Sequence, residues 1–172
     1  MSASERDLNP GEWAVLTLCD EGPTHGFALA QELAPDGPVG RVWSVRRPLV
    51  YRALQRLVGL GLVDELGPEQ SPTGPPRIRV AGTAAARERV DGWLEEPVEH
   101  VRDGRYLLLL KLLFLDRRGR PSDALVDAQT KVYASIEERL RTRLPEAEGF
   151  DRVLMSWRLQ SARAALTFLD EV

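Results

Sequence analysis

The chemistry most evident in the chain is a local excess of positive charge. Residues 37–63 contain no Asp or Glu, although the whole chain has a formal net charge of −3. Surface helices normally mix charges of both signs, so this excess indicates an anionic partner, of which the phosphate backbone of a nucleic acid is the obvious candidate. The cationic side chains in this stretch are Arg41, Arg46, Arg47, Arg52 and Arg56.

A helix would present these side chains on one side. Pro48 fits the first turn of a helix and would disrupt a later turn, so we predict a helix that begins near Pro48, and Gly61 fits the position just after its end. Helical spacing gives one apolar face, composed of Leu49, Val50, Ala53, Leu54, Leu57 and Val58. The other face carries Arg52, Gln55, Arg56 and, at its edge, Tyr51.

The exposed residues of this helix suit duplex DNA. Gln pairs bidentately with adenine, and Arg pairs with guanine or phosphate in the major groove. We therefore expect Arg52, Gln55 and Arg56 to read bases, and Tyr51 beside them to be a further DNA-binding residue. Arg46 and Arg47 precede the helix and are expected to hold phosphates.

Two further helices are predicted before the basic one. Asn9 can cap the first helix, with Pro10 at its first position and Glu12 three residues after the cap. That helix stops at residues 21–23, and Thr24 is expected to cap a second helix that runs to Leu33.

A two-stranded wing is predicted after the basic helix. Residues 62–66 and 77–80 have the pattern of short strands, and the intervening residues 67–76 are too rich in Pro and Gly for regular structure. Because side chains alternate along a strand, Arg77 and Arg79 share a face, while Ile78 and Val80 share the other. The arginines are expected to place the wing beside the DNA backbone or the minor groove.

The rest of the chain reads as helices. Thr83 is expected to cap a helix to about Glu96, and further helices are predicted over residues 106–116, 122–144 and 149–172. The last helix has two apolar stripes, so it needs two packing partners, one of which can be a second copy of the chain. One stripe contains Phe150, Val153, Leu154, Trp157, Ala164 or Ala165, and Phe168; the other contains Met155, Leu159, Ala162, Leu166 and Leu169.

Several strings in the first half resemble the PadR family of transcriptional regulators. They are residues 12–18 (EWAVLTL), 21–30 (EGPTHGFALA), 49–57 (LVYRALQRL) and 61–63 (GLV). The resemblance covers about residues 8–96, and the helical remainder is similar in layout to the dimerisation region of the family. Residues 35–47 form a longer linker than is usual in the family, and the wing loop is unusually rich in proline.

The resemblance implies a mainly α protein with a small two-stranded wing. Residues 1–97 would form a winged helix-turn-helix DNA-binding domain, and residues 98–172 a helical dimerisation region. The implied function is that of a cytoplasmic, homodimeric repressor that binds a palindromic operator and is released by a small aromatic or amphipathic effector.

Other residues leave alternatives open. Trp93 and Trp157 are either core or interface residues, or they line an apolar pocket for an aromatic effector. Trp43 either anchors its loop or faces DNA. His25 is expected to fix a turn through a hydrogen bond rather than to sense pH.

Composition argues against several classes of protein. Cys19 is the only cysteine and the two histidines are far apart, so we expect no metal site and no cofactor. The longest apolar run, residues 106–115, is too short to span a membrane. No nucleophile-elbow or phosphate-loop string indicates an enzyme, and a methyltransferase fragment would need a cofactor-binding string. The alternative of a different class is a winged-helix module that binds another protein and no DNA, which would suit the sequence pI of about 5.5.

Overall fold

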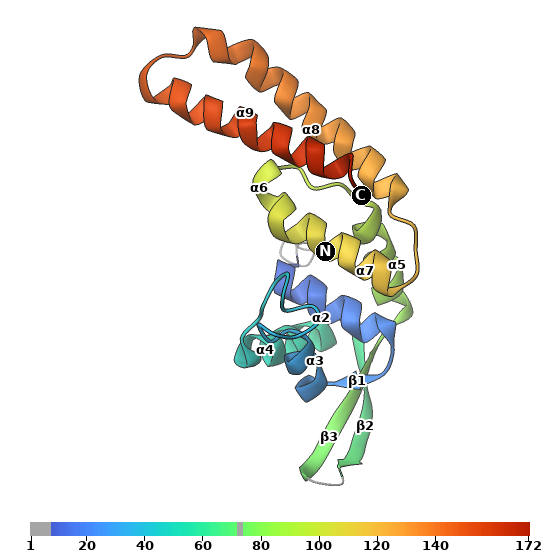
Figure 1. The fold of residues 1–172 in the computed structure, drawn as a ribbon. Helices are drawn as coiled ribbons and strands as arrows, with labels where there is room; N and C mark the ends of the chain where they lie inside the picture. The colour runs from blue at the N-terminus through green and yellow to red at the C-terminus, as the bar shows by residue number, and fades with distance from the viewer. Residues whose placement is uncertain (1–7, 72–73) are drawn as a thin grey trace. The chain divides into compact units, whose positions relative to one another are not determined.

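The computed structural model describes residues 8–71 and 74–172. It contains two compact units (Figure 1): the first ends at Leu94, and the second runs from Glu95 to Val172. The sequence places the boundary after residue 97.

The first unit has the element order of a winged helix. It comprises α2 (Pro10–Glu21), β1 (Thr24–His25), α3 (Gly26–Glu32), α4 (Arg47–Gly59), β2 (Val63–Ser71), β3 (Gly74–Gly82) and α5 (Ala84–Glu95). The mainly helical winged-helix fold expected from the sequence is therefore confirmed. Its core is apolar and is contributed by every helix of the unit, with Leu16, Leu29, Leu57, Val80 and Val90 among the most deeply buried side chains.

The start of α2 follows the sequence closely. The Asn9 side chain accepts a hydrogen bond from the Glu12 amide at 3.0 Å, and Glu12 Oε2 accepts one from the Asn9 amide at 2.8 Å. This reciprocal pair satisfies two amide groups that a helix start leaves without partners. The predicted cap is confirmed.

The cap of α3 differs from the expectation. His25, not Thr24, is the N-cap residue, and its Nδ1 accepts a hydrogen bond from the Ala28 amide at 3.0 Å. Thr24 lies one residue too early, because α3 begins at Gly26. The prediction that His25 fixes a turn is thus confirmed, whereas the assignment of the cap to Thr24 is wrong.

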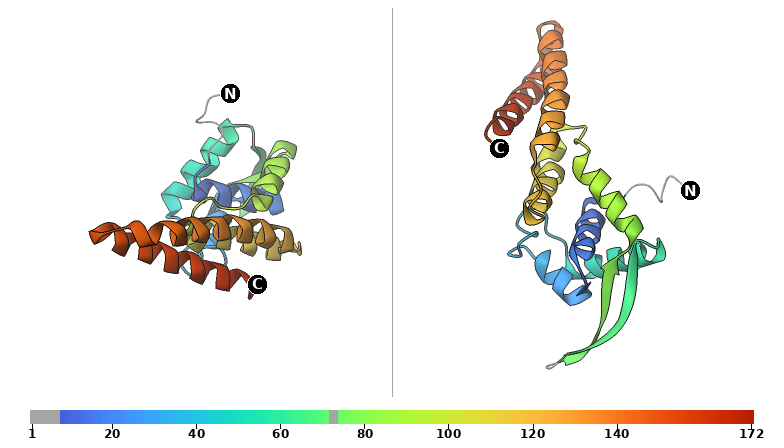
Figure 2. Two further views of the ribbon diagram at one scale, coloured as in Figure 1. Left: turned by 90° about the horizontal axis from the view of Figure 1, so that it is seen from above. Right: turned by 90° about the vertical axis from the view of Figure 1, so that its right-hand side faces the viewer.

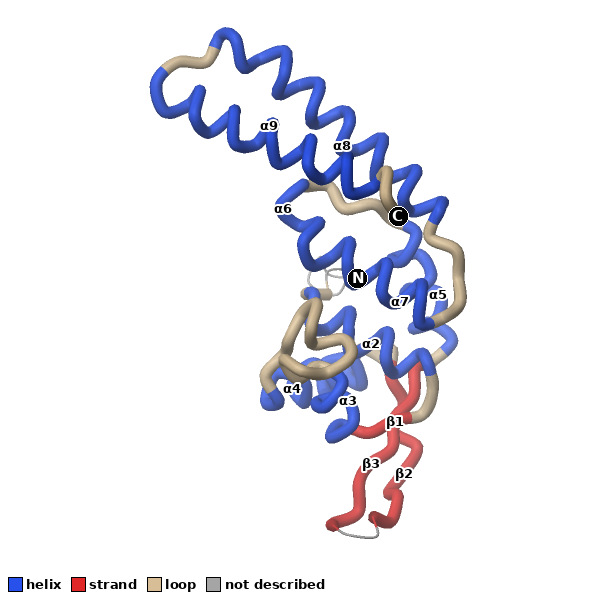
Figure 3. Tube along the Cα trace, viewed as in Figure 1, coloured by secondary structure: helices blue, strands red, loops and turns tan. Residues whose placement is uncertain are grey.

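The sheet is larger than predicted. It has three antiparallel strands in the order β1-β3-β2, because β1 adds to the expected hairpin. Both long strands also extend well into the proline-rich segment, with irregular register between Glu65 and Gly67 and between Glu69 and Ser71. Such bulges accommodate residues that a regular ladder would reject. The hairpin extends away from the helices of its unit (Figures 2 and 3).

The linker between α3 and α4 is a compact series of turns. Val39 and Leu33 are fully buried, and the Val45 amide donates to the Leu33 carbonyl at 2.9 Å. A side chain at Gly40 would place its Cβ only 1.7 Å from the Ala34 carbonyl oxygen, so this turn requires glycine. The long linker therefore fixes the entry to α4, which begins one residue before Pro48.

The second unit is entirely helical. It comprises α6 (Val101–Asp103), η1 (Gly104–Leu108), α7 (Leu109–Arg117), α8 (Asp123–Arg143), η2 (Leu144–Glu146) and α9 (Gly149–Leu169). Helices α8 and α9 form an antiparallel hairpin (Figure 2). The predicted positions of the last three helices are confirmed. The buried Gln129 side chain bonds both backbone groups of Val98, at 2.7 and 2.9 Å, and so ties α8 to the segment that follows α5.

Candidate nucleic-acid interface

The inner face of α4 anchors it in the first unit. Val50, Ala53 and Leu57 are buried at helical spacing. The expected apolar face was too wide, because the Leu49 side chain is 44% exposed and Leu54 and Val58 are only half-buried. The helix therefore contacts its own unit along a narrow stripe and leaves more of its circumference open.

The outer face of α4 is polar and cationic, as predicted. Tyr51, Arg52 and Gln55 are exposed, and Arg46 and Arg47 are exposed at the start of the helix. Gly61 adopts the left-handed conformation, with φ of +68°, and ends the helix where the sequence places its terminus. The structure thus brings five of the eight predicted DNA-binding residues onto one exposed element.

Arg56 differs from its neighbours on this helix. Its Nη1 lies 2.5 Å from Glu12 Oε2, and Glu12 is the same residue that caps α2. The Glu12 side chain is only 8% exposed, against 34% for Arg56. The ion pair therefore joins α4 to the start of α2, which the sequence alone did not reveal.

Tyr51 lies against Gly26, the first residue of α3. A Cβ built at Gly26 would come 2.6 Å from Cε1 of the Tyr51 ring. Glycine at this position therefore lets α3 and α4 approach each other and fixes where the Tyr51 ring lies. This contact explains why a glycine follows the capping histidine.

A cluster around Phe27 links α3, α4 and the wing. The Arg77 guanidinium lies 4.6 Å from the centroid of the Phe27 ring, and that of Arg47 lies 5.5 Å from it. Arg77 Nη1 is also 3.2 Å from His25 Nε2. The wing arginine Arg77 therefore folds back toward the helices, while Arg79 lies opposite His25 in the sheet register and is half-buried.

The two tryptophans considered for an effector pocket differ in their exposure and belong to different units. Trp93 is 6% exposed and its ring stacks on Trp13, with centroids 4.9 Å apart, in the core of the first unit. Trp157 is 72% exposed on α9. Trp43 is half-buried in the linker.

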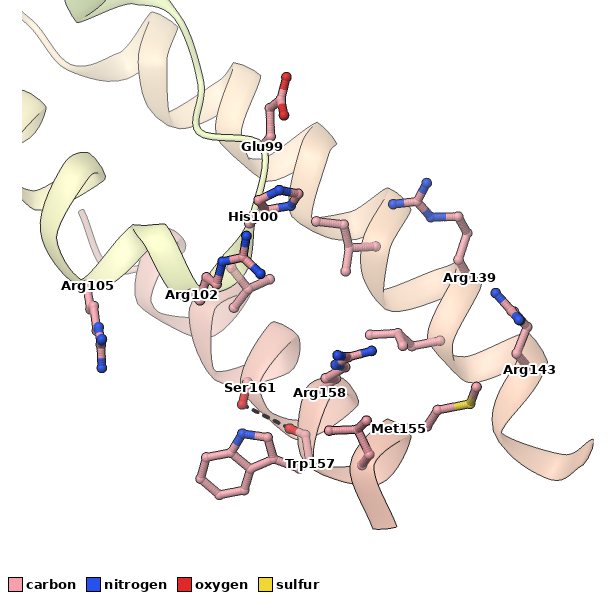
Figure 4. A pocket seen from close by; sticks show the side chains of 14 residues that line it. Glu99, His100, Arg102, Arg105, Arg139, Arg143, Met155, Trp157, Arg158 and Ser161 are labelled. Carbon is pink, nitrogen blue, oxygen red and sulfur yellow. Dashed lines mark hydrogen bonds between the residues drawn. The ribbon is translucent and has the colours of Figure 1, made fainter. Parts of the chain in front are cut away.

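Trp157 lines a groove in the second unit (Figure 4). The groove has a volume of about 970 Å³ and lies among α6, η1, α8 and α9. Its apolar surface comes from Val101, Ile136, Leu140, Leu154, Met155 and Trp157, and its arginines are Arg102, Arg105, Arg139, Arg143 and Arg158. Among the described residues, Glu99 is the only carboxylate that lines it. A surface of this kind suits a ligand with an anionic end and an apolar body.

The outward face of α9 is apolar beside this groove. Leu159, Ala162 and Leu169 are buried, whereas the exposed fractions of Phe150 and Val153 are 76% and 61%. The two stripes predicted for the last helix are thus divided: one contributes buried residues to the unit, and the other exposes large apolar side chains.

Buried ionisable groups lie outside these surfaces. Burial lowers the pKa of Lys111 to about 8, and its Nζ donates to the Glu96 carbonyl oxygen. Burial, assisted by the neighbouring Asp20, raises the pKa of the Cys19 thiol to about 12, which makes it a poor nucleophile. Within residues 8–71 and 74–172, no cluster of three His, Cys, Asp or Glu side chains could hold a metal ion. No helix in these ranges has the length and apolarity needed to cross a membrane.

Comparison with known proteins gives structural matches only. No protein-family model matches the chain, and no curated protein matches it. Similar solved structures include Bacillus subtilis PadR in complex with operator DNA, with 20% identity over 93% of this chain and 96% of that chain and a TM-score of 0.45. Another is smu.1604c from Streptococcus mutans UA159, with 13% identity over 94% and 96% of the two chains and a TM-score of 0.45. A further structure of Bacillus subtilis PadR shares 17% identity over 99% and 95%, with a TM-score of 0.41. At these sequence identities, the matches show likeness of the fold alone.

Proposed function

We propose that this chain is a winged-helix transcriptional regulator of the PadR type that binds duplex DNA through α4. The observation that carries the proposal is the exposed face of α4, where Arg52 and Gln55 stand beside Arg46 and Arg47 in a stretch without a single carboxylate. One helix fits the major groove, where Arg and Gln side chains distinguish base pairs. We assign base contacts to Arg52 and Gln55, and phosphate contacts to Arg46, Arg47 and the wing arginines.

The ion pair of Arg56 gives this residue a different role. Since its guanidinium already contacts the buried Glu12 carboxylate, we assign it to positioning α4 rather than to reading a base. Tyr51, held against Gly26, remains at the edge of the proposed interface.

Binding to random duplex DNA at several salt concentrations tests this proposal. The affinity should fall steeply as salt rises, because bound phosphates release counter-ions. Arg46→Ala should reduce the slope of log affinity against log salt by about 1, because Arg46 is assigned to a phosphate. A protein that shows no salt-dependent retention on DNA would instead be the protein-interaction module that the acidic pI also allows.

We infer that the regulator acts as a homodimer through the exposed face of α9. Phe150, Val153 and Trp157 are large, exposed and spaced for one helical face, and contiguous exposed apolar surface marks interaction sites. A two-fold symmetric dimer presents two recognition helices to the two halves of a palindromic operator. We expect repression, which is the outcome that the resemblance to PadR regulators implies.

The groove beside Trp157 supports an effector site. The structure describes no ion pair that involves Arg105, Arg139, Arg143 or Arg158, so these cations are available to an anionic ligand. We infer an amphipathic anion with an apolar body against Leu154 and Met155. Because Trp157 belongs both to the groove and to the apolar face of α9, a bound ligand would alter the dimer contact and thereby release DNA.

Decanoate and decyltrimethylammonium are suitable probes for this site because they differ in the sign of the charge. Decanoate should change Trp157 fluorescence and weaken DNA binding, and Arg139→Ala combined with Arg158→Ala should abolish both effects. Trp157→Phe serves as the control for the other three tryptophans. Equal responses to the cationic and the anionic probe would contradict an arginine-based site.

A further inference from the structure

The cluster around Phe27 holds two cations that, among the described residues, have no carboxylate at ion-pair distance, although Glu69 lies opposite Arg77 in the sheet register. Arg47 comes from α4 and Arg77 from β3, yet both guanidinium groups lie within 6 Å of the centroid of the same ring, at 5.5 and 4.6 Å. Cation–π attraction favours each contact separately, but it does not cancel the repulsion between the two charges. No carboxylate forms an ion pair with either residue in the part of the chain that the structure describes.

His25 adds a third donor to this cluster. A neutral imidazole carries one proton, and its other nitrogen accepts. Because Nδ1 accepts from the Ala28 amide at 3.0 Å, the ring proton resides on Nε2. Nε2 lies 3.2 Å from Arg77 Nη1, and a guanidinium only donates. Two donors therefore meet at this point, and neither can accept from the other.

The alternative tautomer does not remove the conflict. With the proton on Nδ1, Nε2 would accept from Arg77, but the Ala28 amide would then face an N–H group and lose its acceptor. Protonation of both nitrogens has the same cost. In each protonation state of the ring, at least one N–H group around it therefore lacks an acceptor. An acceptor from another molecule, placed beside Nε2 and Arg77, would satisfy both of these donors while Nδ1 continues to cap α3.

We propose that His25, Arg77 and Arg47 together hold one phosphate group of the DNA backbone. An oxygen of that phosphate accepts from His25 Nε2–H and from Arg77, and Arg47 contributes the second positive charge. This assignment rests on the proposed DNA-binding function and adds His25 to its contacts. Phosphate contacts set the register of a protein on DNA. A shared phosphate would fix the wing and the recognition helix relative to the same point of the duplex.

The substitution His25→Asp separates this role from helix capping. Asp is among the best N-cap residues, so the variant keeps the acceptor for the Ala28 amide, but its charge pairs with Arg77 and repels phosphate. Ser122→Asp is the matched control, since Ser122 is the N-cap residue of α8 and its side chain makes no cap hydrogen bond, so the substitution adds the same charge at another cap. Thermal unfolding of both variants verifies that they fold.

The measurement is affinity for duplex DNA against salt concentration. We expect His25→Asp to bind at least tenfold more weakly than the wild-type protein, with a salt slope reduced by about 1, while Ser122→Asp stays within about twofold. If both residues contact one phosphate, combining Arg77→Gln with His25→Asp should weaken DNA binding little more than His25→Asp does alone. If the wild-type protein binds DNA and the two Asp variants have equal affinities for it, the shared phosphate contact is wrong, whereas the proposed function still stands.

Two other results are also decisive. If the wild-type protein does not bind DNA at any salt concentration, the proposed function and this inference both fail. If inorganic phosphate binds in a way that His25→Asp abolishes, and DNA affinity is unchanged in the variant, the cluster is a free-anion site and the assignment to the DNA backbone is wrong.

Discussion

Arg56 and Glu12 are 44 residues apart in sequence, and their side chains are joined by an ion pair of 2.5 Å between α4 and the capped start of α2. The same carboxylate oxygen accepts from the Asn9 amide at 2.8 Å. One buried acid thus caps the start of α2 and also contacts α4, so the position of the exposed side chains of α4 depends on a residue of α2.

The first prediction concerns this ion pair. Arg56→Ala leaves a largely buried carboxylate with fewer partners, so the free energy of unfolding should fall by about 1–3 kcal/mol. Arg52→Ala, on the exposed side of the same helix, should change it by no more than about 0.5 kcal/mol. Urea unfolding of both variants measures the difference. If Arg56→Ala is as stable as Arg52→Ala yet loses specific DNA binding, Arg56 is a base-reading residue after all.

A second prediction tests the approach of α3 to α4. Gly26→Ala should destabilise the protein by about 1–3 kcal/mol through overpacking, because the new methyl group would lie 2.6 Å from the Tyr51 ring. Tyr51→Ala should restore much of the stability in the Gly26→Ala background. The matched control is Gly92→Ala in α5, where no atom lies within 4 Å of the added Cβ and helix propensity predicts a gain of about 0.5–1 kcal/mol. Similar losses for both alanine variants would argue against a specific clash.

The sequence predicted most of what depends on neighbours along the chain. Asn9 and Glu12 form the expected cap, Gly61 ends α4, and the long helices of the second unit lie where periodicity and Pro or Gly place them. These features are set by spacings of three or four residues, which a single sequence displays directly.

The remaining features depend on contacts between distant segments. The Arg56–Glu12 pair and the approach of Arg77 to His25, 44 and 52 residues apart, have no local signal. The long strands through a proline-rich segment were missed because bulges and strand edges tolerate residues that a regular ladder rejects. The sequence predicts that His25 fixes a turn, but it carries no signal that the second ring nitrogen lies beside a wing arginine.

The buried Lys111 yields a prediction about pH. It is 3% exposed, and burial lowers its pKa from 10.5 to about 8. Between these values the unfolded chain still binds a proton that the folded chain has lost, so the contribution of Lys111 to stability rises with pH across this window and is lowest below pH 8. The free energy of unfolding of Lys111→Met, relative to that of the wild-type protein, should therefore fall by up to about 3 kcal/mol from pH 7 to 10.5.

Chemical unfolding at several pH values checks this expectation. The exposed Lys131 on α8 provides the control, since Lys131→Met should differ from the wild-type protein by a constant amount. A difference for Lys111→Met that does not change with pH would show that the folded protein keeps this lysine charged at no cost.

A fourth prediction concerns the exposed face of α9. Val153→Glu places a charge among the apolar side chains proposed to contact a second copy, and should convert a dimer into a monomer at micromolar concentration, as measured by sedimentation. Ser135→Glu adds the same charge at an exposed position of α8, outside the proposed contact, and should leave the dimer intact. A wild-type protein that sediments as a monomer would contradict the proposed dimer directly.

The most direct test of the central proposal is to select bound fragments from a random pool of duplex DNA and then measure affinity for the enriched sequence. We predict a palindromic sequence with two half-sites about 10 base pairs apart or a multiple of this. The double variant Arg52→Ala, Gln55→Ala should lose most of its preference for that sequence over random DNA, while its thermal unfolding stays unchanged. If no sequence is enriched, or if the double variant prefers the enriched sequence as strongly as the wild-type protein does, α4 does not read DNA.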